Sequence, residues 1–274
     1  MTGFRRLLTW KAWSSVVYGV AATVGGILFL LELGYLGVYR LSFALAQLNP
    51  LLSGFYITVE LVAVILTIGF CLGFLIGWAR TTRFVVLRGI GSVYVDFFRS
   101  MPPIALIFFA ALIGGIELKN STLNPFQIHN ATLWLGVIVL GLHTAAYQAE
   151  IVRAGILSVP AGQTEASDAV GVSRLRSMFV VVLPQAFRVS LPALGNEFSS
   201  SIKDTSLLFV IGWFELSGVA LTLTSTAYTQ WLYGSLVIWI MVAFLYFVLT
   251  YLVTRTVRGV EDLFKVPGLE VARL

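Results

Sequence analysis

The segment from Ser190 to Gly212 carries polar side chains through an otherwise apolar stretch. Seven of them fall on two adjoining faces of a helix: Asn196, Ser199, Ser200 and Lys203 on one, and Glu197, Ser201 and Asp204 on the other. Ionised groups at membrane depth cost about 2.5–3.5 kcal/mol each and usually face a bundle interior or an aqueous cavity. The apolar residues Leu194, Phe198 and Ile202 on the opposite face are suited to packing.

Two interpretations fit this polar stripe. Lys203 could neutralise Glu197 or Asp204 and simply hold a helix bundle together. Alternatively, the stripe lines a path for a zwitterion, because carboxylates, an ammonium and hydroxyls together match both of its poles. The residues that we select for such a path are Asn196, Lys203, Thr205 and Ser206. Asp204 then either pairs with Lys203 or meets the amine of a substrate.

The stretch "FFRSMPPI", Phe97–Ile104, is a second candidate for contact with a substrate, through Arg99, Met101 and Pro102. Adjacent prolines suit a helix start or a break. Only 17 uncharged residues follow Arg99, which is about 25 Å of helix. We therefore expect the motif to dip into the membrane, where a helix N-terminus would offer N–H groups to a carboxylate. The simpler alternative is an interfacial arginine before a membrane span.

These residues must be positioned by membrane-spanning helices. Only 11% of the 274 residues are charged, against about 25% in soluble domains, and the mean hydropathy is +0.91. Six spans of roughly twenty residues are predicted, near 14–38, 54–79, 94–116, 132–156, 189–213 and 233–254. The span near 189–213 is interrupted by charge. Near the end of the fourth span, Glu150 and Arg153 are expected to pair.

The distribution of basic residues predicts the orientation. With six spans, 15 of the 18 Lys and Arg residues fall on the side of the termini, Arg40 and Lys119 fall opposite, and Lys203 lies within a span. Cytoplasmic loops carry this excess, so both termini are expected in the cytoplasm. The first span follows Arg5, Arg6 and Lys11 and is expected to be a retained signal anchor.

Other classes of function lack sequence support. The single Cys71 excludes a disulfide framework, and two histidines, His129 and His143, argue against a metal site. The basic residues are scattered, so the net charge of +5 does not indicate nucleic-acid binding. The chain has no phosphate-binding loop of the G-x-x-x-x-G-K-[ST] type and so cannot use ATP alone.

The segment between the fourth and fifth spans predicts two short helices. The first is expected to start around Gly162–Thr164, with Glu165 and Asp168 in its first turn, and to stop at a left-handed Gly171. Ser173 is a candidate N-cap for the second. The second helix, ended by Pro184, presents an apolar stripe made of Leu175, Met178, Phe179, Val182 and Leu183. This segment is either an amphipathic loop packed on the bundle or a docking element for a soluble partner.

Glu165-Ala166-Ser167, then Gly171, then Val181-Val182-Leu183-Pro184 resembles the EAA motif of ABC importer permeases, with every spacing matched and Ser167 where alanine is usual. The flanking stretches "AAYQAEIVRAGILSVPAGQ" and "LPALGNEFSSSIKDTSLLFVIG", together with "YVDFFRSMPPI", resemble the polar amino-acid branch of these permeases. The resemblance covers residues 52–255, about three-quarters of the chain.

The resemblance implies an all-α integral membrane protein with a type I permease core of five helices plus an N-terminal helix. It implies an N-terminal segment 1–51, a permease domain 52–255 and a cytoplasmic tail 256–274. The loop 160–184 would be a coupling element that docks on an ATPase subunit through Gly162, Glu165, Ala166, Ser167 and Gly171.

The implied partners are ABC ATPase subunits, which would bind the ATP and magnesium, a second permease chain, identical or related, and an extracytoplasmic amino-acid-binding protein. The chain itself, in the cytoplasmic membrane and among its lipids, would be no enzyme and hold no cofactor. The alternatives are an ion-coupled secondary transporter, which would need an inverted repeat, and an intramembrane hydrolase using Ser199–Ser201 beside Lys203.

Overall fold

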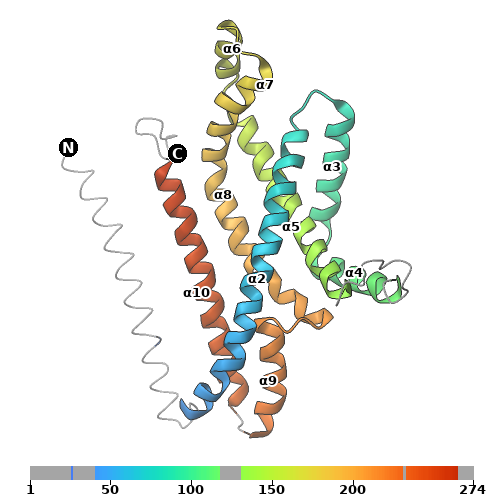
Figure 1. Cartoon of the computed structure of the whole chain (residues 1–274), viewed down its shortest axis with the longest axis vertical. Coiled ribbons are helices and arrows are strands. Elements are labelled where there is room, and N and C mark those ends of the chain that lie inside the picture. Colours follow the sequence, from blue (N-terminus) through green and yellow to red (C-terminus); the bar gives the residue numbers. More distant parts are fainter. Residues whose placement is uncertain (1–25, 27–40, 118–130, 231–232, 265–274) are drawn as a thin grey trace, which may run out of the picture. The chain divides into compact units, whose positions relative to one another are not determined.

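The computed structural model describes residues 26, 41–117, 131–230 and 233–264, and no β-strand occurs among them (Figure 1). The elements follow in the order α2 (Leu41–Ala79), α3 (Val85–Ser100), α4 (Pro103–Glu117), α5 (Ala131–Leu157), α6 (Ala161–Ala169), α7 (Arg174–Ser177), a π-helical turn η1 (Met178–Val182), α8 (Leu183–Asp204), a 3-10 segment η2 (Thr205–Ile211), α9 (Leu216–Gln230) and α10 (Gly234–Leu263). The expected all-α fold is confirmed.

Among the described residues, four stretches are long and apolar enough to cross a membrane: α2, α5, the run from α7 to η2, and α10. They correspond to the spans predicted near 54–79, 132–156, 189–213 and 233–254. The span predicted near 14–38 lies outside the described residues. Helix α9 was not predicted, because its serines and threonines lower the hydropathy of the segment before α10.

The span predicted near 94–116 is wrong in one respect, since two helices occupy this region. Helices α3 and α4 meet at 101° across Met101 and Pro102. Met101 is extended (φ −98°, ψ 136°), as a residue before proline prefers, and Pro103 opens α4 with a φ already suited to a helix. The adjacent prolines therefore end one helix and start the next.

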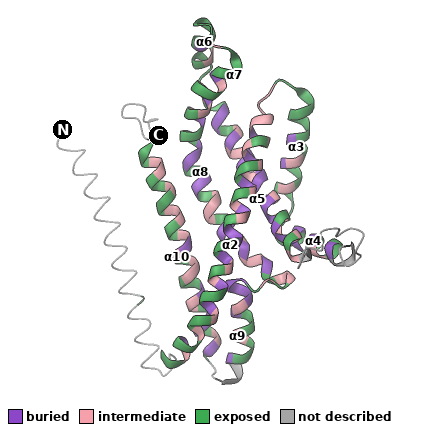
Figure 2. Ribbon diagram, in the orientation of Figure 1, coloured by how far each residue is buried: buried purple, intermediate pink, exposed green. Residues whose placement is uncertain are grey.

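The chain forms two compact units, residues up to 49 with 222–240, and residues 50–221 with 241 onward. In the smaller unit, Gly234 packs closely, since a Cβ added there would lie 3.1 Å from atoms of both Ala227 and Phe43. In the larger unit, α5 packs against α3, α4 and α8. Buried residues concentrate along α5, where 61% of the apolar window is enclosed against 22–33% in the other spans (Figure 2).

Helices α2 and α5 approach closely along a row of glycines. Gly69, Gly73 and Gly77 recur every four residues on α2, and a Cβ at any of them would lie 2.6–2.8 Å from atoms of α5. Small residues allow two helix backbones to approach in this way in membrane proteins. This contact fixes α5, and through it the residues that follow, against α2.

The chain passes from α7 into α8 without a stop, which corrects the expectation that Pro184 ends the second short helix. Pro184 is the second residue of α8 and directly follows the π-helical turn η1, so the proline lies within the continuous helical run. The π-helical turn η1 immediately before it keeps the axis continuous from Arg174 to Asp204.

Candidate functional site

The EAA segment forms α6 and the turn that follows it, directly after α5. Helix α6 begins at Ala161 after Pro160, and its N-cap makes no side-chain hydrogen bond. The expected start near Thr164 is therefore wrong, and neither Glu165 nor Asp168 lies in the first turn. Proline with its φ of −58° starts the helix without a polar cap.

The expected left-handed stop at Gly171 is confirmed by its φ of +77°. The N–H of Val172 donates to the carbonyl of Ser167 at 3.1 Å, and the N–H of Gly171 donates to Asp168 at 3.0 Å. These two bonds form a Schellman motif, which satisfies carbonyls at the helix end. Glycine is required because the left-handed conformation is costly for residues with a Cβ.

The predicted docking residues in and after α6 differ in their exposure to solvent. Gly162, Glu165, Ala166 and Gly171 are exposed, next to Val170 with 78% of its surface accessible. Ser167 is buried, and its hydroxyl has no hydrogen-bond partner among the described residues. The small side chains Gly162 and Ala166 therefore leave an exposed surface beside Glu165, while Ser167 faces the protein.

Only part of the predicted apolar stripe holds this segment on the bundle. Val182 is buried with Val152 and Ile156 of α5, and Met178 and Leu183 pack against this cluster. Leu175 and Phe179 are 64% and 50% exposed. The Phe179 ring still contacts the Trp78 ring of α2 in a T-shaped arrangement, with centroids 5.6 Å apart.

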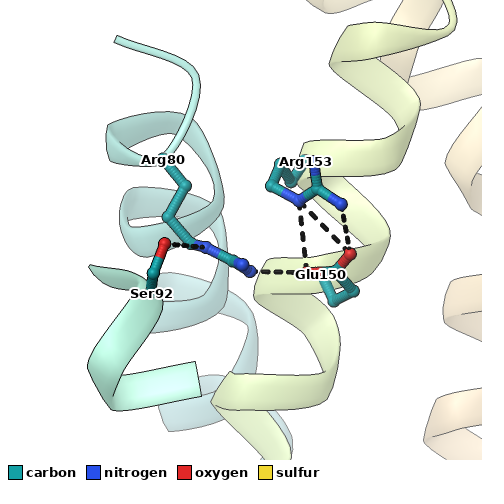
Figure 3. Close-up of polar contacts among 4 residues, drawn as sticks. All are labelled: Arg80, Ser92, Glu150 and Arg153. Atoms are coloured by element: carbon teal, nitrogen blue, oxygen red, sulfur yellow. Dashed lines mark hydrogen bonds and ion pairs between the residues drawn. The ribbon is translucent and has the colours of Figure 1, made fainter. Parts of the chain in front are cut away.

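An ion-pair cluster joins the end of α5 to α2 and α3 (Figure 3). Glu150 contacts Arg153 and Arg80, each at 2.5 Å, and Arg80 also donates to the hydroxyl of Ser92 at 3.3 Å. The pairing of Glu150 with Arg153 is confirmed. Arg80 was missed, although its position at the end of the second predicted span was the available signal. Gly91 makes room for it, since a Cβ there would lie 2.8 Å from the Arg80 Cγ.

A cavity of about 200 Å³ lies between the start of α4, the middle of α5 and the last turns of α8. Its lining residues are Pro103, His143, Tyr147, Glu197, Ser200 and Asp204. The guanidinium carbon of Arg99 lies over the Tyr147 ring, 5.2 Å from its centroid. The bend between α3 and α4 and the polar stripe of α8 thus meet at one cavity.

The predicted path residues are distributed unevenly around this cavity. Asp204 lines it. Arg99 is not among the lining residues but contacts Tyr147, which is. Asn196 and Lys203 are exposed and lie outside the lining. Thr205 is fully buried, and its hydroxyl donates to the carbonyl of Ile202 at 2.7 Å. Met101 and Pro102 are exposed, and Ser206 is half-buried. His143, Tyr147 and Glu197 were not among the predicted path residues.

Two details differ from the expectations. Pro102 and Pro103 carry no N–H, and the amides of Ala105 and Leu106 donate to the Pro102 carbonyl. In the first turn of α4, at most the Ile104 N–H is then free to donate. The N-terminus of this helix therefore offers a carboxylate no more than one backbone hydrogen bond. Across the described part of the chain, no ion pair within 4.0 Å joins Lys203 to Glu197 or Asp204.

A second buried carboxylate was missed entirely. Glu215 is inaccessible to solvent between η2 and α9, and its oxygens accept from the Gly218 amide and the Tyr246 hydroxyl, both at 2.8 Å. The Thr58 hydroxyl of α2 lies 3.3 Å from Glu215 and 3.0 Å from the Gly54 carbonyl, either of which can accept its proton, and it accepts from the Leu216 amide at 3.0 Å. The cluster ties α2 and α10 to the start of α9.

Comparisons with known proteins agree with this architecture. Residues 69–262 match the family model of the binding-protein-dependent transport system inner membrane component. The L-cystine transport system permease protein TcyB of Bacillus subtilis is 37% identical over 213 residues, 77% of this chain and 86% of that protein. The glutamine transport system permease protein GlnP of Escherichia coli is 31% identical over 72% of this chain and 85% of its own length.

Among solved structures, an amino acid ABC transporter crystallised with histidines matches with a TM-score of 0.67 and 28% identity, over 82% of this chain and 98% of that one. The family match extends from the glycine row of α2 through α6 and the cavity to the end of α10. The chain belongs to the family of binding-protein-dependent transport system inner membrane components.

Proposed function

We propose that this chain is the permease subunit of an ATP-driven importer that moves polar amino acids across the cytoplasmic membrane by alternating access. Its relatives include permeases named for L-cystine and glutamine transport. The coupling element would be the loop 160–184, and the path would run past the bend at Arg99, Met101 and Pro102 and along α8. The permease domain would span 52–255, between an N-terminal segment 1–51 and a cytoplasmic tail 256–274.

The observation that carries this proposal is the geometry of α6. A nine-residue helix with exposed small residues follows α5 and is closed by the Schellman motif at Gly171. Helix α6 packs against η1, and Val182 of η1 is buried with Val152 and Ile156 of α5. A movement imposed on α6 would therefore reach α5, which lines the cavity with His143 and Tyr147.

The proposed partners follow from this arrangement. The exposed surface at Gly162, Glu165, Ala166 and Gly171 would enter a groove of an ATPase subunit, with Ser167 supporting the helix from inside. One chain carries one such element, so two permease chains, identical or related, would engage two ATPase subunits. These subunits would bind ATP and magnesium, while this chain needs no cofactor. An extracytoplasmic binding protein would deliver the amino acid, and both termini would lie in the cytoplasm.

Co-purification tests this assignment. Glu165→Arg places a cation where the family motif has an acid and should release the ATPase or abolish ATP-dependent uptake, while membrane insertion stays intact. Asp168→Asn changes a neighbouring exposed acid of α6 and serves as the control. If Glu165→Arg retained both the ATPase and full transport, α6 would not be the coupling element.

The two alternatives find no supporting contact. Ser199 and Ser201 donate to the backbone carbonyls of Gly195 and Glu197, as structural serines of a helix do. Lys203 is exposed, and in the described part of the chain no hydrogen bond joins it to either serine. An ion-coupled transporter would work without the ATPase, so ATP-independent uptake in proteoliposomes would favour it over the importer.

A further inference from the structure

We propose that one face of α10, between Phe247 and Arg258, binds an anionic membrane phospholipid whose phosphate is held by Arg255 and Arg258. This face belongs to the larger unit, and none of its residues lines the cavity between α4, α5 and α8. The proposal does not depend on which solute the chain transports. It comes from a hollow on α10, the order of the side chains along it, and two cations without a counter-charge.

A hollow of about 160 Å³ lies along this face of α10. The described residues that line it are Phe247, Thr250, Tyr251, Thr254, Arg255 and Arg258. They recur at intervals of three or four residues, so they share one side of the helix. The helical rise makes this stripe about 16 Å long. A stripe of this length can meet both the headgroup of a lipid and the first part of its acyl chains.

The chemistry of the hollow changes along its length. At one end, Phe247 offers an apolar surface that is 62% exposed. The hydroxyls of Thr250 and Thr254 follow, and the two arginines close the other end. A phospholipid presents complementary groups in the same order, namely acyl chains, ester groups and a phosphate.

The guanidinium of Arg255 is oriented by a row of aromatic rings. Its central carbon lies 5.8 Å from the centroid of the Tyr251 ring. The Tyr251 ring in turn stacks on the Phe247 ring, with centroids 5.9 Å apart and 24° between the planes. A guanidinium over an aromatic face is attracted by the ring and keeps its planar set of N–H donors for an oxyanion. This arrangement prepares Arg255 for a phosphate.

The positive charge at this end of the hollow is not neutralised by the described residues. Arg255 and Arg258 lie three positions apart on one helix, where like charges repel. Both are exposed, and in the described part of the chain no ion pair within 4.0 Å joins either to a carboxylate. Guanidinium groups bind phosphate oxygens through two parallel hydrogen bonds. An anionic lipid would therefore supply the missing counter-charge.

The arginines lie at the end of the helix bundle from which α6 extends. Thr254 and Ser199 of α8 share a hydrogen bond of 2.9 Å, and the rings of Phe264 and Phe187 lie 5.8 Å apart. The C-terminal end of α10 therefore packs beside the first half of α8, which continues from α7. In the orientation that the basic residues predict, this is the cytoplasmic side. Basic pockets of membrane helices on that side recognise anionic headgroups.

The N-terminal segment of the chain is the other candidate to occupy this face. It carries Arg5, Arg6 and Lys11, and no acidic residue precedes Glu32. Its first part would add to the positive charge of Arg255 and Arg258 and would not neutralise it. Charge complementarity therefore favours the lipid.

Lipid titration tests the proposal. The full-length chain, purified with the subunits that it retains in a non-ionic detergent, is titrated with dioctanoyl phosphatidylglycerol, and bound lipid is measured by native mass spectrometry. Dioctanoyl phosphatidylcholine is the matched control, because it has the same chains and phosphate but no net charge. We expect phosphatidylglycerol to bind about tenfold more tightly. Equal affinities would overturn the proposal.

A competition experiment distinguishes a lipid from a free phosphate. Glycerol 1-phosphate has the phosphate of phosphatidylglycerol without its acyl chains. At the same concentration it should displace little of the bound phosphatidylglycerol, because it makes no contact with the apolar end of the hollow. Full displacement would show that the arginines bind a free phosphate and would overturn the assignment to a membrane lipid.

Variants test the residues. Arg255→Gln and Arg258→Gln should each weaken phosphatidylglycerol binding about fivefold, and the double variant about 25-fold, while phosphatidylcholine binding is unchanged. Tyr251→Leu keeps both charges but removes the ring under Arg255, and should weaken binding about threefold. Arg88→Gln, at an exposed arginine of α3, is the control and should bind as the unmodified chain does. Unaltered phosphatidylglycerol binding in the double variant, with an unfolding temperature like that of the unmodified chain, would refute the proposal.

Site-specific cross-linking identifies the occupant in the membrane. A photoreactive residue, p-benzoylphenylalanine, replaces Thr250 in the middle of the hollow, and the products formed in native membranes are analysed by mass spectrometry after proteolysis. An adduct with an anionic phospholipid is expected. Cross-links only to peptides from residues 14–38 would show that the N-terminal segment occupies the face and would overturn the proposal.

Discussion

Arg80 at the end of α2 and Glu150 late in α5 are 70 residues apart in sequence, yet their side chains form an ion pair of 2.5 Å (Figure 3). The side chain of Arg80 is 11% exposed, and that of Arg153, the other partner of Glu150, is 31% exposed. The more enclosed arginine links different helices, whereas Arg153 lies on the same helix as Glu150. The pair with Arg80 therefore fixes the end of α5 relative to α2, ahead of α6.

Arg80→Gln should lower the free energy of unfolding by about 1–3 kcal/mol, because the enclosed Glu150 loses a charged hydrogen-bond donor. Arg153→Gln should cost less, since exposed pairs contribute only about 0–1 kcal/mol. The measurement is thermal unfolding of the purified protein in detergent. Arg88→Gln, at an exposed arginine of α3, is the control and should stay within about 0.5 kcal/mol. Equal losses for Arg80→Gln and Arg88→Gln would contradict the role of the inter-helix pair.

Gly73→Ala should destabilise the protein by about 1–3 kcal/mol, because its Cβ would lie 2.8 Å from the Gln148 Cβ and would force α2 and α5 apart. Gly89→Ala is the matched control, since Gly89 is also helical and its Cβ would meet nothing within 4 Å. That change should be neutral or slightly stabilising. Comparable unfolding temperatures for the two variants would show that the glycine row is not a close contact.

Hydropathy predicted α2, α5 and α10, because a membrane span requires a long apolar run, and it was weakest for the span near 189–213, which charge interrupts. It failed where the backbone bends. The pair Pro102-Pro103 was recognised as a break or a start, but only the structure shows that it does both and turns the chain by 101°. Pro184 was placed at a helix end, although a proline is equally compatible with a first turn, and the π-helical turn before it is not encoded in any simple pattern.

The cavity shows a different limit of sequence reasoning. Helical spacing placed Asp204 on a polar face, but a helix face does not reveal which other element completes a cavity. His143 and Tyr147 lie one turn apart in an apolar span, where a single histidine gives no motif. Their role depends on the packing of α5 against α4 and α8, which no local pattern specifies.

Gly171→Ala should weaken ATPase coupling by distorting the turn after α6. At a φ of +77°, alanine costs about 1–2 kcal/mol and would favour loss of the Schellman bonds. Gly162→Ala, within α6 where a Cβ meets nothing within 4 Å, should leave the fold of the loop unchanged. The measurement is protease sensitivity of the loop together with ATPase stimulation by amino acid. Normal coupling and protection in Gly171→Ala would show that the left-handed turn is dispensable.

Tyr246→Phe should destabilise the protein by about 1–3 kcal/mol, because the fully buried Glu215 would lose the donor at 2.8 Å and no solvent can replace it. Thr58→Val removes the second side-chain donor to Glu215, so the two changes should be non-additive in a double-mutant cycle. Tyr251→Phe, at a tyrosine of α10 that is 49% exposed, makes the same chemical change and should cost less than about 0.5 kcal/mol. Strict additivity of Tyr246→Phe and Thr58→Val, or equal losses in Tyr246→Phe and Tyr251→Phe, would show that Glu215 does not hold α2 and α10 together.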